Sequence, residues 1–374
     1  MRAGAEAWDR LRGQTERAGS RSALGKRRKV SQCSGEIAPI HRGRIDRGHE
    51  AAELRGVRVT TAARLHLGFL DFNGDLGRRF GSIGLAIDAF ETCVELHDAS
   101  SFEILGDERG RGARLFRRIA EFLGVDTAKK LVISSAIPPH AGLGSGTQLA
   151  LAIASAFRRF ANLPLDVRGD ARLLDRGARS GVGAALFERG GLVVDAGRGP
   201  DTEIPPVVAR VNLPEDWRVL LVLDPRVTGA HGEAERRAFA DLPHMSAELA
   251  GEICRRTLMQ ILPGAAEGDF AAFGDGVSRV QEILGDYFAP VQGGGRFTSA
   301  GVSRVSALLA SHGASGVGQS SWGPTGFAFS PDPDHAEFLA RRAGAEHEPG
   351  VEVKICAVRD RGAEIREDED VSIQ

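Results

Sequence analysis

The stretch that decides the fold is Pro138-Pro139-His140-Ala141-Gly142-Leu143-Gly144-Ser145-Gly146-Thr147-Gln148. An extended segment, Lys130 to Ile137, leads into it, and an apolar helix is predicted to follow over Leu149 to Phe160. Glycines at alternate positions let the backbone turn sharply and expose amide N–H groups, and the helix adds the positive end of its dipole. The pattern therefore predicts an anion-binding loop for phosphate or pyrophosphate. A purely structural loop is the alternative.

The spacing of this loop differs from two common phosphate-binding patterns. Walker A requires a lysine before the Ser/Thr, and the dinucleotide pattern has two residues between its last glycines. Ser145 and Thr147 also place hydroxyls where a Mg²⁺ ion, held mainly by water and phosphate oxygens, would lie. Gln148 either contacts the substrate or caps the helix. The predicted phosphate-binding residues are Gly142, Leu143, Gly144, Ser145, Gly146 and Thr147.

Length and composition describe an ordinary globular chain. With 374 residues it is long enough for two domains with substantial cores, and 42% of its residues are hydrophobic. A formal net charge of -2 argues against nucleic-acid binding and fits a small anionic substrate better. The sequence lacks the apolar run of a membrane helix or a secretory signal, so we expect a cytoplasmic protein with no membrane partner. The cysteines lack the paired spacing of a zinc site or a redox dithiol; they are Cys33, Cys93, Cys254 and Cys356.

The chain divides into three parts. Residues 1–56 are rich in Arg, Gly and Ser and contain the basic cluster Lys26-Arg27-Arg28-Lys29, so we expect a disordered basic tail without a functional role. Residues 57–214 form the expected N-terminal domain, which carries the phosphate loop. A proline-marked connection at Pro205-Pro206 and Pro214 leads to a C-terminal domain over residues 215–374. Runs of strands beside helices predict the α+β class.

Periodicity gives the expected elements of both domains. Val219 to Leu223 is a continuous apolar run typical of a strand buried on both faces. Helices are expected at Ala113–Leu123 and at about 246–262, 268–286 and 300–312. Other extended segments are expected at Val57–Thr61, Leu65–Phe72, Ile83–Ile87, Thr92–His97, Gly191–Asp195 and Gly326–Phe329.

An early strand carries two polar candidates. Alternation along Ala63 to Phe69 places Leu65, Leu67 and Phe69 on one face, and Arg64 with His66 on the other. The planar guanidinium of Arg64 suits phosphate or carboxylate, and the imidazole of His66 titrates near neutral pH, so the pair is suited to orient an anionic substrate. A solvated strand face is the alternative.

Further candidates lie in the second half of the chain. Gln319, Ser320, Ser321 and Thr325 offer hydrogen bonds in a loop that can close over a ligand, and Trp322 either stacks on an aromatic ring or packs in the core, with packing favoured. Arg296, which follows Gly293-Gly294-Gly295, is a weaker anion-binding candidate. Asp224, His231, Glu233 and Glu235 follow the buried strand. They suit a metal or a catalytic base, but an exposed helical face is slightly favoured for the two glutamates.

Three segments, in this order, resemble the motifs of the GHMP kinase superfamily. They are Arg64-Leu65-His66-Leu67-Gly68, then Pro138 with Gly142-Leu143-Gly144-Ser145, and then Gly316-Val317-Gly318-Gln319-Ser320-Ser321-Trp322-Gly323-Pro324-Thr325. Within that superfamily two variants look like the β-ribofuranosylaminobenzene 5'-phosphate synthases: Gly144-Ser145-Gly146-Thr147-Gln148 and Gln319-Ser320-Ser321-Trp322-Gly323-Pro324-Thr325. The resemblance covers about residues 57–330. It implies a two-domain GHMP-kinase-like fold, with a ribosomal-protein-S5-domain-2-like N-terminal domain, a ferredoxin-like C-terminal domain, and a homodimer.

The segment Arg176 to Gly183 bears on the reaction. The superfamily's kinases have a Ser-Gly-x-Asp pattern here, whose aspartate orients or deprotonates the attacking hydroxyl. The matching position of this chain is Gly183, which has no side chain to accept a proton. Arg179, four residues earlier, suits a carboxylate or a 5'-phosphate; a surface salt bridge is the alternative.

The resemblance thus implies a decarboxylating phosphoribosyltransferase of tetrahydromethanopterin biosynthesis. Its substrates would be phosphoribosyl pyrophosphate and 4-hydroxybenzoate or 4-aminobenzoate, with Mg²⁺ as cofactor. Arg64, His66 and Arg179 are the candidate catalytic residues. Two other interpretations remain: an ATP-dependent small-molecule kinase that finds its base elsewhere, for example Asp224, Glu233 or Asp71, and a non-catalytic ligand sensor.

Overall fold

The computed structural model describes residues 55–107, 110–230, 232–346 and 348–368. The expected basic tail falls almost wholly outside these residues, as do Cys33 and His231. Residues 52–374 group into one compact unit. The division at residue 214 therefore remains a prediction about two halves of that unit.

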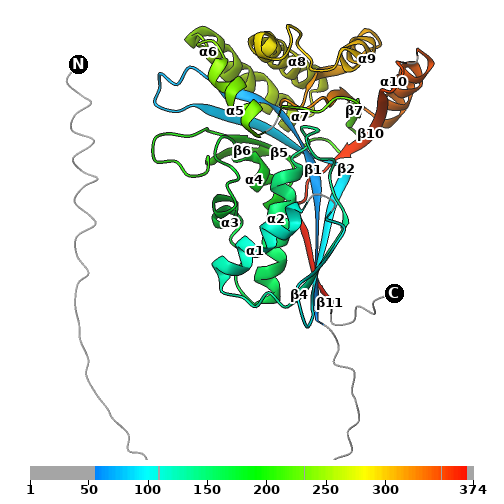
Figure 1. Ribbon diagram of the computed structural model, residues 1–374. Coiled ribbons are helices and arrows are strands. Elements are labelled where there is room, and N and C mark those ends of the chain that lie inside the picture. The colour runs from blue at the N-terminus through cyan, green and yellow to red at the C-terminus, as the bar shows by residue number, and fades with distance from the viewer. Residues whose placement is uncertain (1–54, 108–109, 231, 347, 369–374) are drawn as a thin grey trace, which may run out of the picture. The chain divides into compact units, whose positions relative to one another are not determined.

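The strands of the described residues form one mixed sheet (Figure 1). Its main path runs β11-β1-β2-β10-β7-β9-β8, and β3, β4, β5 and β6 branch from it beside β2. The last strands of the chain thus pair with the first ones. The strands are β1 Gly56–Asp71, β2 Phe80–Asp98, β3 Glu103–Leu105, β4 Lys129–Ser135, β5 Leu192–Asp195, β6 Val207–Val211, β7 Arg218–Leu223, β8 Ser315–Gln319, β9 Gly326–Ser330, β10 Glu352–Val358 and β11 Glu364–Asp368.

The sequence predicts four short strands at the start of the fold, but the structure has two long strands there. β1 and β2 pair antiparallel along their whole length, with irregularities in register between Ala62 and Ala63 and between His66 and Gly68. Such β-bulges bend a strand and redirect its side chains. The second bulge changes the expected alternation around His66.

Helices cover the sheet as two groups (Figure 1). In one group α1 and α2 bury Phe116 and Phe157 against Val59, Val94 and Leu131 of the sheet. In the other, α6 and α8 pack on β1 and α8 also packs on β8, while α9 and α10 pack on β7. The helices are α1 Arg111–Leu123, α2 Ser145–Phe160, α3 Val167–Leu173, α4 Val182–Glu188, α5 Gly232–Asp241, α6 Ala247–Arg256, α7 Leu262–Glu267, α8 Phe270–Phe288, α9 Ala300–Ser311 and α10 Pro333–Ala345, with a π-helical turn at Thr257–Ile261 and a 3₁₀ turn at Ala289–Val291.

β7 confirms the expected strand with two buried faces. Val219 and Leu221 belong to the core beneath α8, whereas Leu220 and Val222 belong to the core beneath α9 and α10. Side chains that alternate between two covered faces must all be apolar, which explains the continuous apolar run.

Most predicted elements are confirmed, and the C-terminal strands were not foreseen. β10 and β11 carry charged residues and have many partly exposed positions, so they show no continuous apolar run. Charged side chains are usual on an edge strand such as β11, where they oppose aggregation, whereas β10 lies inside the sheet between β2 and β7. Within the residues that the structure describes, no helix has the length and apolar character needed to cross a membrane.

Candidate functional site

The glycine loop joins β4 to α2 and turns through left-handed conformations. Gly142 has a φ of 78° and Gly144, the N-cap of α2, a φ of 83°. Thr147 and Gln148 donate their N–H groups to the carbonyl of Gly144, so the first-turn amides that have no partner within the described structure are those of Ser145 and Gly146. These amides and the helix dipole suit an anion, as predicted.

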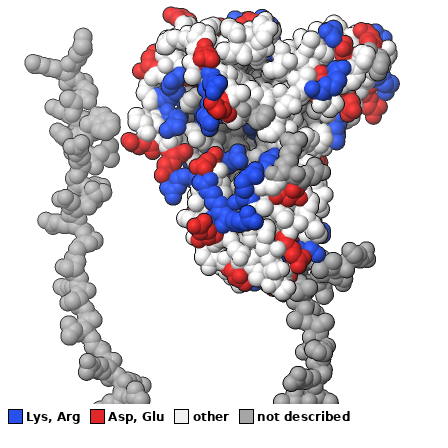
Figure 2. Space-filling view, in the orientation of Figure 1, with Lys and Arg blue, Asp and Glu red and all other residues white. Residues whose placement is uncertain are grey.

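Two arginines flank this loop. The Nη1 of Arg64 donates to the carbonyl of Gly142 at 2.7 Å, and its backbone N–H donates to the carbonyl of Leu143 at 3.1 Å. On the other side, Nη1 of Arg176 lies 3.1 Å from the point that a β-carbon on Gly146 would occupy. The Nε atoms of both arginines are buried and have no hydrogen-bond partner among the described residues. Basic side chains also gather near the centre of the face seen in Figure 2.

Both arginines remain cations at neutral pH in spite of their burial. Burial lowers the pKa of Arg64 to about 10, with the carboxylate of Glu235 acting in the opposite direction. Burial also lowers the pKa of Arg176. Two desolvated positive charges with unused N–H groups beside a helix N-terminus form a strong site for a phosphate or diphosphate.

Ser320 brings the three sequence motifs together. Its hydroxyl donates to the carbonyl of Gly142 at 2.8 Å and accepts the backbone N–H of His66 at 3.0 Å. The neighbouring Ser321, with a φ of 56°, donates its N–H to the carbonyl of His66. The carbonyl of Ser320 lies so close to Gly142 that a β-carbon there would collide with it. The three motifs, which are far apart in the sequence, therefore meet at Ser320.

His66 is buried and neutral, which corrects the expectation that it titrates near neutral pH. Only 3% of its surface is exposed. Burial, and then the charges of Arg64 and Arg179, lower its pKa to about 3. Its ring lies 4.4 Å from that of Phe69, so these two side chains share a side of β1 where simple alternation had separated them. The bulge between His66 and Gly68 is the physical reason.

Arg179 lies near this site but is already paired. It donates to Glu235 of α5 at 2.7 Å, and its guanidinium stacks over the ring of Phe239 at 4.3 Å. Glu235 is half-buried in this pair, so the exposed-face interpretation fails for it, whereas Glu233 is exposed and pairs with Arg237 as expected. Asp224 is engaged elsewhere because it accepts bonds from Arg226 and Ser299.

Gly183 lies beside the phosphate loop. It is the second residue of α4, and a β-carbon on it would stand 3.0 Å from Cγ2 of Thr147. The position where kinases carry an aspartate therefore faces the predicted anion site, as the resemblance implies. A side chain there would meet the loop at once.

The polar groups of several other predicted site residues bond to neighbouring parts of the protein. The side chain of Gln148 accepts from Thr61 and donates to the carbonyl of Gly183, so both its polar ends are used within the protein. Gln319 accepts from Thr298, and the backbone carbonyl of the buried Thr325 accepts the N–H of Ser320. Arg296 forms a two-point ion pair with Asp286 at 2.6 and 2.8 Å.

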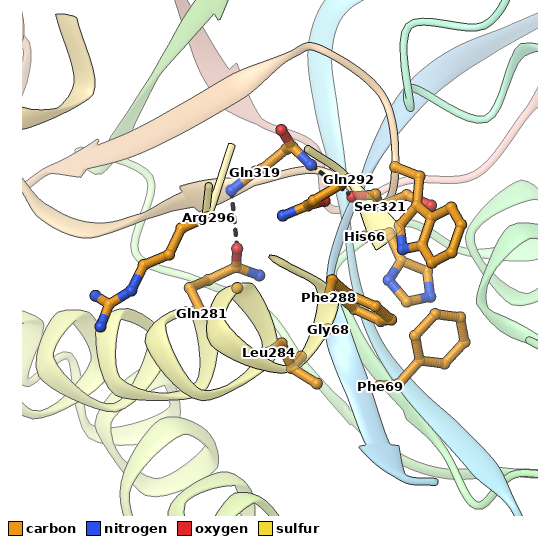
Figure 3. A pocket seen from close by; sticks show the side chains of 12 residues that line it. His66, Gly68, Phe69, Gln281, Leu284, Phe288, Gln292, Arg296, Gln319 and Ser321 are labelled. Atoms are coloured by element: carbon orange, nitrogen blue, oxygen red, sulfur yellow. Dashed lines mark hydrogen bonds between the residues drawn. The ribbon is translucent and has the colours of Figure 1, made fainter. Parts of the chain in front are cut away.

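A small cavity is lined by His66 and Ser321, and Ser320 links the backbone of His66 to Gly142 of the loop. Figure 3 shows His66, Phe69 and Phe288 at one side of it, Gln281 and Gln319 at the other, and the guanidinium of Arg296 directed away. Trp322, buried and stacked on Phe239 at 4.7 Å, forms part of its wall. Trp322 thus packs in the core and also lines the cavity, so its burial leaves open a contact with a ligand.

The donor set near the loop suits a metal ion that arrives with a ligand. Among the described residues, His, Cys, Asp and Glu form no cluster of three that would hold a metal. The hydroxyls of Ser145 and Thr147 are the oxygen donors at the loop, and Mg²⁺ commonly uses one or two protein oxygens with phosphate oxygens and water. These residues fit that arrangement.

Sequence reasoning missed several residues of this site. Arg176 lies in the segment that drew attention for Arg179 and Gly183. Its approach to Gly146 depends on a chain reversal at Asp175 and Gly177, whose φ angles are 55° and 83°. Gln281 and Gln292 come from α8 and the turn after it, and neither had a motif to mark it. An arginine within seven residues of the Gly183 position was the available signal for Arg176.

Known proteins similar to this chain fall in one superfamily. The family models of the GHMP kinases N-terminal domain and C-terminal domain match residues 111–191 and 261–349. The beta-ribofuranosylphenol 5'-phosphate synthase of Archaeoglobus fulgidus is 34% identical over 241 residues, which are 61% of this chain and 76% of that protein. The protein of the same name from Methanothermobacter thermautotrophicus is 30% identical over 288 residues, 71% of this chain and 86% of its own. A solved mevalonate kinase from L. major has a TM-score of 0.63 at 14% identity, with 81% of this chain and 96% of that chain covered, and shows the fold alone.

Proposed function

Because this chain belongs to the beta-ribofuranosylphenol 5'-phosphate synthase family of the GHMP kinase superfamily, we propose that it is a decarboxylating phosphoribosyltransferase of tetrahydromethanopterin biosynthesis. It joins phosphoribosyl pyrophosphate to 4-hydroxybenzoate or 4-aminobenzoate and releases CO₂ and pyrophosphate. The relatives' names describe a phenol product, which favours 4-hydroxybenzoate. The expected GHMP-kinase-like α+β fold is confirmed by the two family models.

The observation that carries the proposal is the pair of desolvated arginines on a glycine loop that faces Gly183. As the bond between ribose C1 and the diphosphate oxygen breaks, its electrons pass to the diphosphate. The first-turn amides of α2, Arg64 and Arg176 lie where they stabilise this growing negative charge. Arg179 is less suited to the diphosphate because Glu235 already neutralises it.

The other half of the reaction needs no residue at the Gly183 position. The ring carbon that bears the carboxylate forms the new bond to ribose C1. The C–C bond to the carboxylate then breaks, its electrons return to the ring, and CO₂ leaves. Because the loss of CO₂ restores aromaticity, no general base has to remove a proton from an attacking hydroxyl. A glycine at that position is therefore compatible with this chemistry and unsuited to phosphoryl transfer.

Mg²⁺ enters the proposal as a companion of the diphosphate. When bound, it would neutralise part of the leaving-group charge, with the Ser145 or Thr147 hydroxyl as a protein ligand. The proposal also includes a homodimer and a cytoplasmic location. Light scattering of the purified protein tests the homodimer, and fractionation of the source cells tests the location.

One assay compares the proposed reaction with its alternatives. The purified protein is incubated with Mg²⁺ and either phosphoribosyl pyrophosphate or ATP, in the presence of carboxyl-labelled 4-hydroxybenzoate or 4-aminobenzoate. We expect equal amounts of pyrophosphate and labelled CO₂ from the ribosyl donor and no ADP from ATP. ADP formation with a phosphorylated product would instead support the kinase. Donor binding without any turnover would support a ligand sensor.

A further inference from the structure

Unsatisfied polar atoms concentrate around the small cavity beside the glycine loop. Seven buried side-chain nitrogen or oxygen atoms of the described residues have no hydrogen-bond partner. Three of them, Nε2 of His66, Oε1 of Gln292 and Nε1 of Trp322, belong to residues that line this one cavity. Leaving a buried polar atom unpaired costs about 1–3 kcal/mol, so three at one cavity point to a missing ligand.

The walls of the cavity are aromatic. Phe69, Phe288 and Trp322 line it, and the rings of Phe288 and Trp322 meet edge to face at 5.2 Å. Phe69 contacts the ring of His66. Rings in this arrangement favour a flat apolar body over a sugar or a flexible chain. The polar atoms then serve the substituents of that body.

The cavity and the glycine loop lie next to each other along β1. Arg64 and His66 are two positions apart on this strand, which corresponds to about 7 Å, and Arg64 contacts the glycine loop while His66 lines the cavity. Ser320 bonds to both sites, through Gly142 and through His66. The glycine loop and the cavity are therefore neighbours along β1, so a diphosphate in the loop and a ligand in the cavity would lie side by side.

We propose that this cavity is the subsite for the aromatic acceptor, with the para substituent of the benzoate inserted toward His66, Gln292 and Trp322 and its carboxylate directed outward to the glycine loop. This assignment rests on the proposed function. It makes Trp322 and Gln292 specificity-determining residues and His66 a positioning residue.

Charge fixes this orientation. His66 is neutral at physiological pH, Gln292 and Trp322 carry no charge, and Arg296 is paired with Asp286 outside the cavity. Arg296 is the one cation among the described residues that line the cavity and is already paired, so a carboxylate placed deep in it would gain no unpaired positive charge from the wall, which is costly, whereas a phenol or an amine needs only hydrogen bonds. The outward carboxylate also brings the carbon that bears it next to the ribose.

The ring enters by displacing one wall. The cavity has a volume of about 20 Å³, close to that of a single water site. Gln292 and Arg296 bound a turn in which Gly293 and Gly294 adopt φ angles of 90° and 87° and have open space around them. Movement of this turn joins the cavity to the groove of about 370 Å³ that shares Gln281, Arg296 and Gln319 with it.

Equilibrium binding tests the assignment without turnover. Isothermal titration compares 4-hydroxybenzoate with benzoate, which lacks the para substituent, on the wild-type protein and on Trp322→Phe and Gln292→Leu. Trp322→Phe keeps the aromatic ring and removes the N–H. Each variant should weaken 4-hydroxybenzoate binding about 3- to 10-fold, the loss of one hydrogen bond, and change benzoate binding less than about 2-fold. Trp217→Phe is the matched control, because Trp217 is equally buried, packs on Phe270 and Phe273, and does not line the cavity.

The outcomes separate this inference from the proposed function. Equal effects of the variants on both ligands, no effect on either, or no binding of 4-hydroxybenzoate by the wild-type protein would overturn the subsite. If the ligand-selective losses occur but the wild-type protein releases no pyrophosphate from phosphoribosyl pyrophosphate, the subsite stands and the proposed reaction fails. If turnover is normal and the variants bind 4-hydroxybenzoate as the wild type does, the proposed reaction stands and the subsite assignment fails.

Discussion

Gly183 and Thr147 are so close that a β-carbon on the glycine would stand 3.0 Å from Cγ2 of the threonine. The residue that replaces the kinase aspartate therefore touches the loop that we propose to bind the phosphates. Space and charge both oppose an acidic side chain here, because a carboxylate would displace Thr147 and face the proposed diphosphate site. The glycine suits a site that stabilises a departing anion.

Gly183→Asp should not create a kinase. We expect no ADP formation from ATP, and a loss of pyrophosphate release from phosphoribosyl pyrophosphate of at least about 10-fold, as removal of favourable electrostatics commonly gives. The control Gly183→Ala adds the β-carbon without the charge and separates the two causes. Efficient ATP-dependent phosphorylation by Gly183→Asp would contradict the account of this position.

Gly144→Val should abolish binding of phosphoribosyl pyrophosphate. A β-carbon at Gly144 would lie 2.9 Å from Cγ of Arg64, and the φ of 83° is strained for any residue except glycine. Gly124→Val is the matched control, since Gly124 has a φ of 63° at the end of α1 and open space around it. Titration of both variants with the donor gives the comparison, and unchanged affinity in Gly144→Val would falsify the loop assignment.

Arg176→Ala should raise the KM for phosphoribosyl pyrophosphate by roughly 10- to 100-fold, the usual loss for a hydrogen bond to a charged group. The KM for 4-hydroxybenzoate should change much less, because Arg176 lies at Gly146 and not at the cavity. Arg172→Ala removes a nearby arginine that is exposed and paired with Glu203, and should leave both constants unchanged. Similar effects of the two variants would show that Arg176 has no special role.

Asp195 should make the protein more stable at mildly acidic pH. Burial raises the pKa of Asp195 from 3.8 to about 6, against the opposing hydrogen bonds from the backbone N–H groups of Gly197 and Gly181. The folded chain thus keeps a proton that the unfolded chain releases between about pH 4 and 6. Its contribution is fully present below that window and is lost as the pH rises through 6. Urea unfolding across this range should show a decrease of up to about 3 kcal/mol that is absent from Asp195→Asn. Parallel curves for the two proteins would contradict it.

His66 acts in the opposite direction. Its pKa falls from 6.5 to about 3 in the folded chain, so the unfolded chain binds a proton below pH 6.5 that the folded chain does not. Stability should therefore decrease as the pH falls from 6.5 toward 3, by roughly 1.4 kcal/mol for each unit of pH. His66→Gln should remove this slope. A wild-type protein that loses no more stability than His66→Gln over this range would show that the imidazole is not held neutral.

The local features of the site were predictable from the sequence, but the burial of its side chains by distant elements was not. The glycine loop, its flanking strand and helix, and the approach of Gly183 follow from local pattern and motif resemblance. The burial of His66 depends on α8, which packs so tightly on β1 that a β-carbon on Gly68 would lie 2.6 Å from Leu284. No local pattern around His66 contains that contact.

Contacts between side chains that are distant in the sequence could not be predicted from the sequence either. The sequence pattern of α5 predicts an exposed helix. The half-burial of Glu235 on it depends on Arg179, which comes from a separate segment and also stacks on Phe239. The bulge after His66 shifts Phe69 to the same side of β1 through a change of register that is visible only in the paired strands. Such features arise from long-range packing, which overrides the simple period of a strand.

The hydroxyl of Ser320 has a consequence for how the protein is made. It joins Gly142 to the backbone of His66, although these residues leave the ribosome long before Ser320 does. A nascent chain thus contains the glycine loop, Arg64 and Arg176 before it contains the Ser320 hydroxyl that links Gly142 to His66. We therefore expect donor binding to require synthesis of the chain through Ser320, so chains that end before this residue should not bind phosphoribosyl pyrophosphate.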